Sequence, residues 1–305
     1  MNRNTRGCIL LLITALIWGT AFVAQSTAMD NIGPLLFVVV RFLLGGAVLL
    51  PFIFVLNKKK LNSGLITKSA QRDLTAKSIK GGIICGLGLL AGTTLQQCGL
   101  ITTSAGKSAF ITALYIIIVP IAGTLIGKRI SKAVWISVVI AIIGFYLLCI
   151  KDGFSVAKGD FLCLLSAFAF TFQILFIDHF MEKGVDPVIL SCTEFFTVAF
   201  IAFFPMLIFE GFHMQLIKDA AFSIFYCGVM SSGVAYTLQV IGQRDTDPAI
   251  ATLIMSLESV FAALSGWLLL HEQMTARELI GCAMVFAAVL LAQLAPNMFH
   301  KKVFS

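Results

Sequence analysis

Residues 34–56 read PLLFVVVRFLLGGAVLLPFIFVL, an apolar stretch whose only charged residue is Arg41. An α-helix rises about 1.5 Å per residue, so a stretch of this length matches the hydrocarbon core of a bilayer, roughly 30 Å thick. A surface helix of a soluble protein would need a polar face toward water, which this stretch lacks. Residues 34–56 therefore predict a transmembrane helix.

Similar apolar stretches recur along the chain of 305 residues, of which 59% are hydrophobic and 12% are charged. A soluble domain has about 25% charged residues. The polar stretch from Lys58 to Lys80 is expected to be a loop, too short to form a core of its own. We therefore predict an all-α integral membrane protein with ten transmembrane helices. They are Gly7–Gln25, Pro34–Leu56, Gly81–Leu100, Ser104–Ile126, Ala133–Ile150, Phe161–Met181, Pro187–Phe209, Ala220–Gln243, Pro248–Leu270 and Glu278–Ala295.

The charges of the connecting loops predict the orientation. The net charge is +7, and most Lys and Arg residues fall in the loops on the same side as the N-terminus. Short loops rich in Lys and Arg stay in the cytoplasm. We therefore expect a multi-pass protein of the cytoplasmic (inner) membrane with both termini in the cytoplasm. The positive charge then serves orientation, and no binding of nucleic acid is expected.

The two halves of the chain carry a weak internal repeat. Segment 34–42 matches segment 187–195: each begins with proline and ends with a charged residue followed by phenylalanine. We therefore predict two five-helix repeats, residues 1–152 and 153–305, around a central cavity. An odd number of helices per repeat inverts the second one in the membrane, as in many secondary transporters. Because the repeat needs residues 7–25 as its first helix, we do not interpret them as a cleaved signal peptide.

Short motifs follow one another in order along the predicted helices. They are Ala15-Leu-Ile-Trp-Gly19, Val40-Arg-Phe42, Gln97-Cys-Gly-Leu100, Ser104–Phe110, Val119-Pro120, Leu257–Leu264 and Leu270-His-Glu272. In this order they resemble the ten-helix, EamA-type members of the drug/metabolite transporter superfamily, over nearly the full chain. The resemblance implies two intertwined five-helix halves, with the fifth and tenth helices at the periphery. It also implies alternating-access transport of a small metabolite, amino acid or drug-like solute, without fixing the substrate.

The chain departs from four-helix relatives in the superfamily, which place a proton-coupling glutamate within the first helix. The first and sixth predicted helices have Trp18 and Phe170 in that region and no acid at that depth. The resemblance therefore carries over no coupling acid from those relatives.

Three charged residues lie well inside predicted helices: Arg41, Glu194 and Glu258. A charge at a helix centre costs roughly 2.5–3.5 kcal/mol on insertion scales, so it usually faces a cavity or a partner. From their depths, we expect Arg41 to interact with Glu258, directly or through substrate. Two interpretations stay open, a site for a polar or zwitterionic substrate and a structural ion pair. Glu194 and Glu258 are candidate acids for proton coupling, because burial favours the neutral form of a carboxyl group. For Glu194 a second interpretation stays open, a carboxylate near the inner interface that meets water.

Further polar and aromatic residues are candidates for a substrate cavity. Amides can serve a substrate or bond neighbouring helices, and aromatic rings can line a cavity or only fill space. With the charged pair, the candidates are Trp18, Arg41, Gln96, Gln97, Phe110, Tyr115, Gln173, Tyr236, Gln239 and Glu258.

These features favour a secondary transporter over an enzyme. No Walker motif is present, so ATP is not the direct energy source. The histidines and cysteines are scattered, so we expect no metal, no cofactor and no catalytic cluster. The alternative is a membrane-embedded lipid-modifying enzyme. The expected partners are a small-molecule solute, the lipid bilayer and coupling protons, with the chain as a monomer or homodimer.

Overall fold

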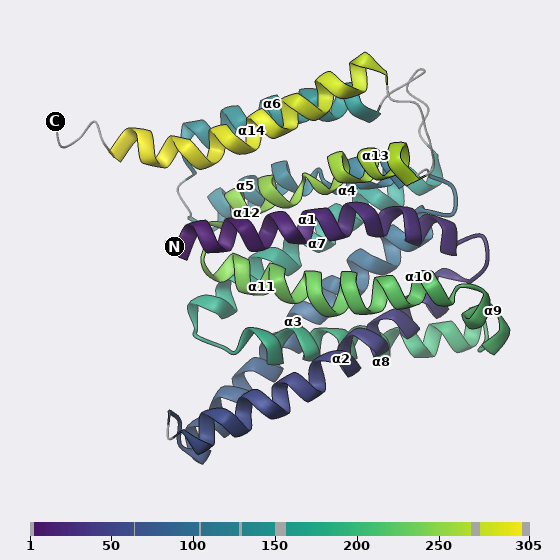
Figure 1. The fold of residues 1–305 in the computed structure, drawn as a ribbon, viewed down its shortest axis with the longest axis vertical. Helices are drawn as coiled ribbons and strands as arrows, with labels where there is room; N and C mark the ends of the chain where they lie inside the picture. Colours follow the sequence, from purple (N-terminus) through teal and green to yellow (C-terminus); the bar gives the residue numbers. More distant parts are fainter. Residues whose placement is uncertain are drawn as a thin grey trace.

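The computed structural model describes residues 3–63, 65–103, 105–127, 130–149, 157–269 and 275–300. Within these ranges it contains α-helices and one π-helix (η1) but no strand, so the all-α prediction is confirmed there. Figure 1 shows most helices running side by side in one bundle. The elements are α1 Arg3–Ala28, α2 Pro34–Asn62, α3 Lys68–Gly99, α4 Ala105–Thr112, α5 Tyr115–Leu125, α6 Lys132–Cys149, α7 Lys158–Glu182, α8 Pro187–Phe209, α9 Met214–Asp219, α10 Ala221–Phe225, η1 Tyr226–Tyr236, α11 Thr237–Arg244, α12 Pro248–Met255, α13 Glu258–Leu269 and α14 Ala276–His300.

Eight helical segments in the described ranges are long and apolar enough to cross a membrane. Two further apolar helices, within α6 and α14, are shorter. Every predicted span coincides with a helix or a run of helices. The protein is therefore a multi-pass membrane protein. Ten crossings and the inverted repeat stay predictions. The boundary predicted at 152/153 and the motif residues Ser104, Leu270, His271 and Glu272 lie outside the described residues.

The polar stretch expected as a loop is mostly helical. α2 continues to Asn62, and α3 already starts at Lys68, where the Thr67 hydroxyl accepts a hydrogen bond from the Ala70 amide at 3.3 Å. The reason is that Lys, Gln and Ala favour helix in water as well as in lipid. We call this part of the bundle, with the basic residues between Lys58 and Lys80, the basic end.

Glycines let α3 pack closely between α7 and α8. A Cβ on Gly82 would lie 2.5 Å from the Cβ of Thr193 on α8. A Cβ on Gly88 would lie 2.8 Å from the Phe172 ring on α7. Both distances are below van der Waals contact, so only glycine permits these separations.

Two predicted spans are broken near their centres. The fourth span divides into α4 and α5 at Ala113 and Leu114, and the ninth divides into α12 and α13 at Ser256 and Leu257. Neither break is at a proline; Pro120 lies inside α5. Discontinuous helices expose backbone ends inside the membrane, which is tolerated where they line a cavity. The two breaks therefore predict a cavity beside these spans, at the centre of the bundle.

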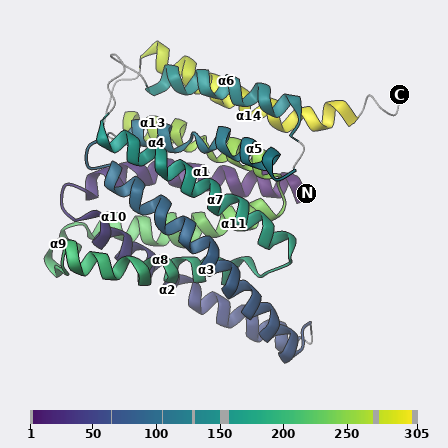
Figure 2. The same ribbon diagram turned by 180° about the vertical axis from the view of Figure 1, so that it is seen from behind.

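The helices α6 and α14 pack against each other along one edge of the bundle, as both views show (Figures 1 and 2). This is the peripheral position that the family resemblance implies for the fifth and tenth helices. The helix α1 crosses the middle of the bundle in Figure 1 and contacts α11, α13 and η1. The centre of the protein is therefore built around α1.

Candidate functional site

A small cavity lies where α1, α2, η1 and the two broken spans meet. Its free volume is about 30 Å³, room for about two water-sized molecules. The free space in this conformation is therefore too small for a metabolite. The lining residues are Trp18, Phe22, Gln25, Arg41, Gln96, Thr112, Tyr115, Phe170, Ile174, Ser231, Tyr236, Met255 and Glu258.

Arg41 supplies the positive charge of the cavity wall. Its side chain is only 2% exposed. Its Nη1 donates to Gln25 Oε1 at 2.5 Å and its Nε to Ser232 Oγ at 3.4 Å. The guanidinium also lies 4.8 Å from the centre of the Phe42 ring, a cation–π contact. Neutral groups therefore hold the guanidinium in place.

Glu258 places a carboxyl group in the cavity wall. It is 4% exposed and is the first residue of α13, directly after the break. Its Oε1 accepts a hydrogen bond from the Tyr115 hydroxyl at 3.0 Å. Tyr115 is the first residue of α5, so the donor follows the other break. The positive end of the α13 dipole also favours a carboxylate at this position.

Arg41 and Glu258 line the same cavity without forming an ion pair. Within the described part of the chain, the ion pairs involve neither residue. The direct contact expected from the sequence is therefore absent in this conformation, because Gln25 and Tyr115 occupy the two groups. An interaction through substrate stays a prediction.

Four further residues predicted from the sequence also line the cavity. The indole of Trp18 donates to the Ser231 carbonyl at 3.4 Å and packs on Tyr236, with ring centres 4.7 Å apart. Gln96 donates to the Thr112 hydroxyl at 3.2 Å, and Tyr115 contacts Glu258. The cavity wall thus combines aromatic rings with polar and charged groups that could orient a small molecule.

The other four predicted residues lie outside this wall. Gln97 donates to the Gln25 carbonyl at 3.5 Å, and the Phe110 ring packs on Phe145. Gln173 donates to Glu194, and Gln239 is buried elsewhere. Successive helical residues point about 100° apart, so neighbours such as Gln96 and Gln97 cannot share one narrow cavity.

Seven lining residues were not predicted from the sequence: Phe22, Gln25, Thr112, Phe170, Ile174, Ser231 and Met255. A helical period could have found two of them, because Phe22 and Gln25 follow Trp18 at i+4 and i+7. Ser231 lies in the π-helix, and Met255 lies directly before a helix break. The helical period does not hold at either place.

Glu194 lies on α8, outside the cavity, and its side chain is completely buried. Its Oε1 accepts a hydrogen bond from Gln173 Nε2 at 3.1 Å. Its Oε2 has no hydrogen-bond partner within the described residues. The carboxyl group therefore has a single donor and no access to water.

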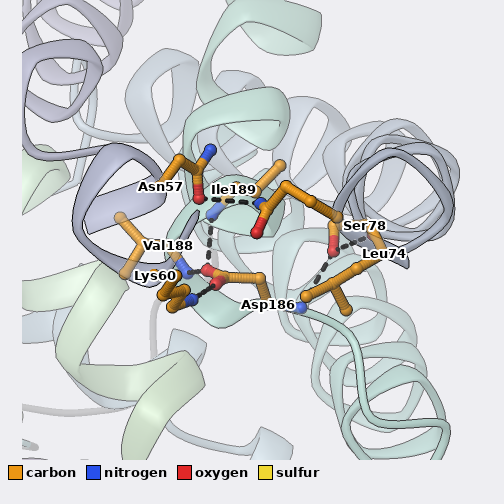
Figure 3. Close-up of polar contacts among 8 residues, drawn as sticks. Asn57, Lys60, Leu74, Ser78, Asp186, Val188 and Ile189 are labelled. Carbon is orange, nitrogen blue, oxygen red and sulfur yellow. Dashed lines mark hydrogen bonds and ion pairs between the residues drawn. The ribbon is translucent and has the colours of Figure 1, made fainter. Parts of the chain in front are cut away.

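At the basic end, a polar cluster joins α2 and α3 to the start of α8 (Figure 3). Lys60 Nζ lies 2.7 Å from Asp186 Oδ2, and the Asp186 amide donates to the Ser78 hydroxyl at 2.9 Å. The other carboxylate oxygen of Asp186 accepts from the Val188 and Ile189 amides, which caps α8. The cluster therefore joins the two predicted halves at this end.

Two polar contacts join the predicted halves at the opposite end. The Glu210 carboxylate, after α8, accepts from the Leu35 and Leu36 amides at 2.9 and 2.8 Å, so it caps α2. Lys107 Nζ lies 2.6 Å from Asp160 Oδ2. The cavity therefore lies between polar contacts at both ends of the bundle.

Comparison with known proteins places this architecture in a group of transporters. The sequence model of the EamA-like transporter family matches residues 5–150 and 157–294. An "Uncharacterized transporter" from Archaeoglobus fulgidus is 29% identical over 93% of this chain and 84% of its own length. A "Probable amino-acid metabolite efflux pump" from Escherichia coli is 26% identical over 92% of each chain. A solved crystal structure with 16% identity has a TM-score of 0.75, covers 96% of this chain and 98% of its own, and shares the fold.

Proposed function

Because the chain belongs to the EamA-like transporter family, we propose that it is a secondary transporter that moves a small zwitterionic metabolite by alternating access. The cavity between α1, α2 and the two broken spans is the substrate site. One observation carries the proposal: Arg41 and Glu258 have opposite charges, line one cavity and do not pair with each other.

The charge pattern favours a zwitterion. A substrate carboxylate would form a bidentate pair with Arg41, whose planar guanidinium fits that geometry. A substrate ammonium would reach Glu258, whose carboxylate has one neutral donor. A substrate with both groups neutralises both buried charges, whereas a singly charged solute leaves one without a counter-ion. The name of the Escherichia coli relative supports an amino-acid metabolite as the substrate class.

The closed cavity and the contacts at its two ends support alternating access. A central volume of about 30 Å³ requires the bundle to open before a metabolite can enter. Opening at the basic end breaks the contact between Lys60 and Asp186, and opening at the opposite end releases Glu210 from α2. Two repeats, residues 1–152 and 153–305, would move against each other about the cavity. Following the loop charges, the basic end faces the cytoplasm.

Solute exchange in proteoliposomes tests the proposal. Vesicles loaded with a neutral amino acid should take up the labelled amino acid by counterflow. Arg41→Ala and Glu258→Gln should each reduce this exchange at least tenfold, since each leaves one substrate charge without a partner, a loss of about 1.5–3 kcal/mol. Lys218→Ala, far from the cavity on the short helix α9, is the matched control for loss of a positive charge.

A charge swap separates a substrate site from a structural ion pair. Arg41→Glu, Glu258→Arg and the double variant are purified and compared for folding and exchange. The proposal expects the double variant to fold but to stay inactive, because the hydrogen-bond partners of each charge are not exchanged. Restored exchange in the double variant would make the pair structural and contradict the proposal.

A further inference from the structure

The surroundings of Glu194 contain few groups that could stabilise an ionised carboxylate. Removing a carboxylate from water costs several kcal/mol unless cations or several donors compensate. Glu194 is completely buried, with one amide donor on Oε1 and no partner on Oε2 within the described residues. A carboxylic acid fits the same place better, since a bound proton removes the charge.

No cation in the described structure lies against Glu194. Among the helices that pack on α8, α3 contributes Cys85 and η1 contributes Tyr236, both neutral groups. The charged residue of α11 is Arg244, at the end of that helix, which pairs with Asp245 at 3.5 Å. The facing residue on α7 is the amide Gln173. On α2, Arg41 is held by Gln25 and Ser232 and forms no ion pair with Glu194 within the described residues. Only a proton can therefore neutralise Glu194 in this conformation.

Resting on the transport function proposed above, we propose that Glu194 is the proton-binding site that couples this transporter to the transmembrane proton gradient. The carboxylate takes up one proton from water on one side of the membrane when the bundle opens there. The neutral acid is then buried as in the structure. After reorientation it releases the same proton to water on the other side, so one proton crosses per cycle.

Aromatic contacts connect this proton site to the substrate cavity. Phe195, next to Glu194, lies 5.7 Å from Phe42 and 6.2 Å from Tyr236 between ring centres. Phe42 is the neighbour of Arg41, and Tyr236 lines the cavity. A substrate that moves the Arg41 segment of α2 therefore moves the ring packed beside Glu194.

Glu258 is a poorer candidate for the same role. It lines the cavity, where a substrate ammonium would meet it. A proton on Glu258 would compete with the substrate for one oxygen. Glu194 lies outside the cavity, so proton and substrate do not compete for the same oxygen atom.

The test compares exchange with accumulation in proteoliposomes. Glutamine replaces the neutral acid with the same shape, so Glu194→Gln should keep counterflow at equal pH within about twofold of wild type. It should lose accumulation driven by a pH gradient and lose solute-driven pH change inside the vesicle. Wild-type protein should show both. Glu194→Asp keeps an acid and should keep coupling at a lower rate.

The outcomes distinguish the two proposals. If wild type shows no counterflow, the transport function itself is wrong. If wild type exchanges solute but shows no response to the pH gradient, or if Glu194→Gln still accumulates solute, the proton site is wrong.

Infrared spectroscopy supplies a second readout that does not depend on transport by the variant. Wild type at neutral pH should show the band of a buried protonated carboxylic acid, and Glu194→Gln should lack it. The spectra of wild type and Glu194→Gln are then compared. If the variant loses only bands of an ionised carboxylate, the proposal is overturned. Asp219→Asn, which alters an exposed carboxylate on α9, should leave the band unchanged.

Discussion

The hydroxyl of Tyr115 donates a hydrogen bond to Oε1 of Glu258 at 3.0 Å, across 143 residues of sequence. Each residue is the first of the helix that follows a break, α5 for Tyr115 and α13 for Glu258. The predicted repeat relates these two broken spans to each other. The contact thus joins the two predicted halves at the wall of the cavity.

Removal of this contact should weaken substrate binding. Tyr115→Phe deletes the hydroxyl and keeps the ring, so Glu258 loses the donor that fixes its position. A hydrogen bond to a charged group contributes about 1.5–3 kcal/mol, so the KM for exchange should rise roughly 10- to 100-fold. The control is Tyr226→Phe, whose hydroxyl contacts Thr20 away from the cavity. An unchanged KM in Tyr115→Phe would show that Glu258 does not bind substrate.

Loss of the ion pair at the basic end should favour opening at that end. Asp186→Asn keeps a side-chain oxygen to cap α8, because asparagine is a good N-cap, but removes the charge that faces Lys60. A cysteine at Ser231, in a variant without native cysteines, should then react several-fold faster with an impermeant thiol reagent added from the basic-end side.

Two further variants control this measurement. Lys60→Ala should have the same effect as Asp186→Asn, since either change removes the ion pair. The swap of the two charges, Lys60→Asp with Asp186→Lys, should return labelling toward wild type. Equal labelling of all variants would mean that the ion pair does not hold this end closed.

Loss of the Glu210 charge should favour opening of the bundle at the end opposite the basic end. Its carboxylate accepts two amide hydrogen bonds from the first turn of α2 and interacts with the helix dipole there. Glu210→Gln loses the charge and one acceptor oxygen. We expect faster labelling of the same cysteine from the side opposite the basic end. Faster labelling from the basic-end side instead would contradict the idea that Glu210 holds the opposite end closed.

Because α3 is packed closely against α8, replacing a glycine of α3 should lower stability without altering the candidate site. A Cβ on Gly82 would lie 2.5 Å from Thr193 Cβ and 2.6 Å from the Leu190 carbonyl. Overpacking of this kind costs about 1–3 kcal/mol, so Gly82→Ala should lower the Tm of the purified protein measurably. Gly106→Ala, where the added Cβ meets nothing within 4 Å, should leave Tm nearly unchanged. Equal Tm values for the two variants would show that α3 and α8 can separate freely.

Much of the fold could be predicted because lipid restricts the choices. A long apolar stretch such as residues 34–56 has to be helical in a bilayer, where every backbone amide needs an internal partner. The breaks after Thr112 and Met255 could not be predicted in the same way. Neither break contains proline or glycine, and the backbone amides there bond to carbonyls three or four residues earlier, so no local sequence signal marks either break.

The candidate site was partly predictable. A charge inside an apolar helix is rare and expensive, so Arg41 and Glu258 stand out in the sequence, and both line the cavity. Amides give no such signal. Gln96 lines the cavity and Gln97 bonds the backbone of α1, although the two are adjacent in sequence.

The sequence by itself determined that this chain is a helical membrane protein, since composition and the length of the apolar stretches leave no other stable arrangement in lipid. It also identified the buried charges. Only the tertiary structure decided that Arg41 and Glu258 share a cavity without touching and that Glu194 is sealed away from it. Those facts depend on helix rotation and on side-chain partners far apart in sequence, which local composition does not specify.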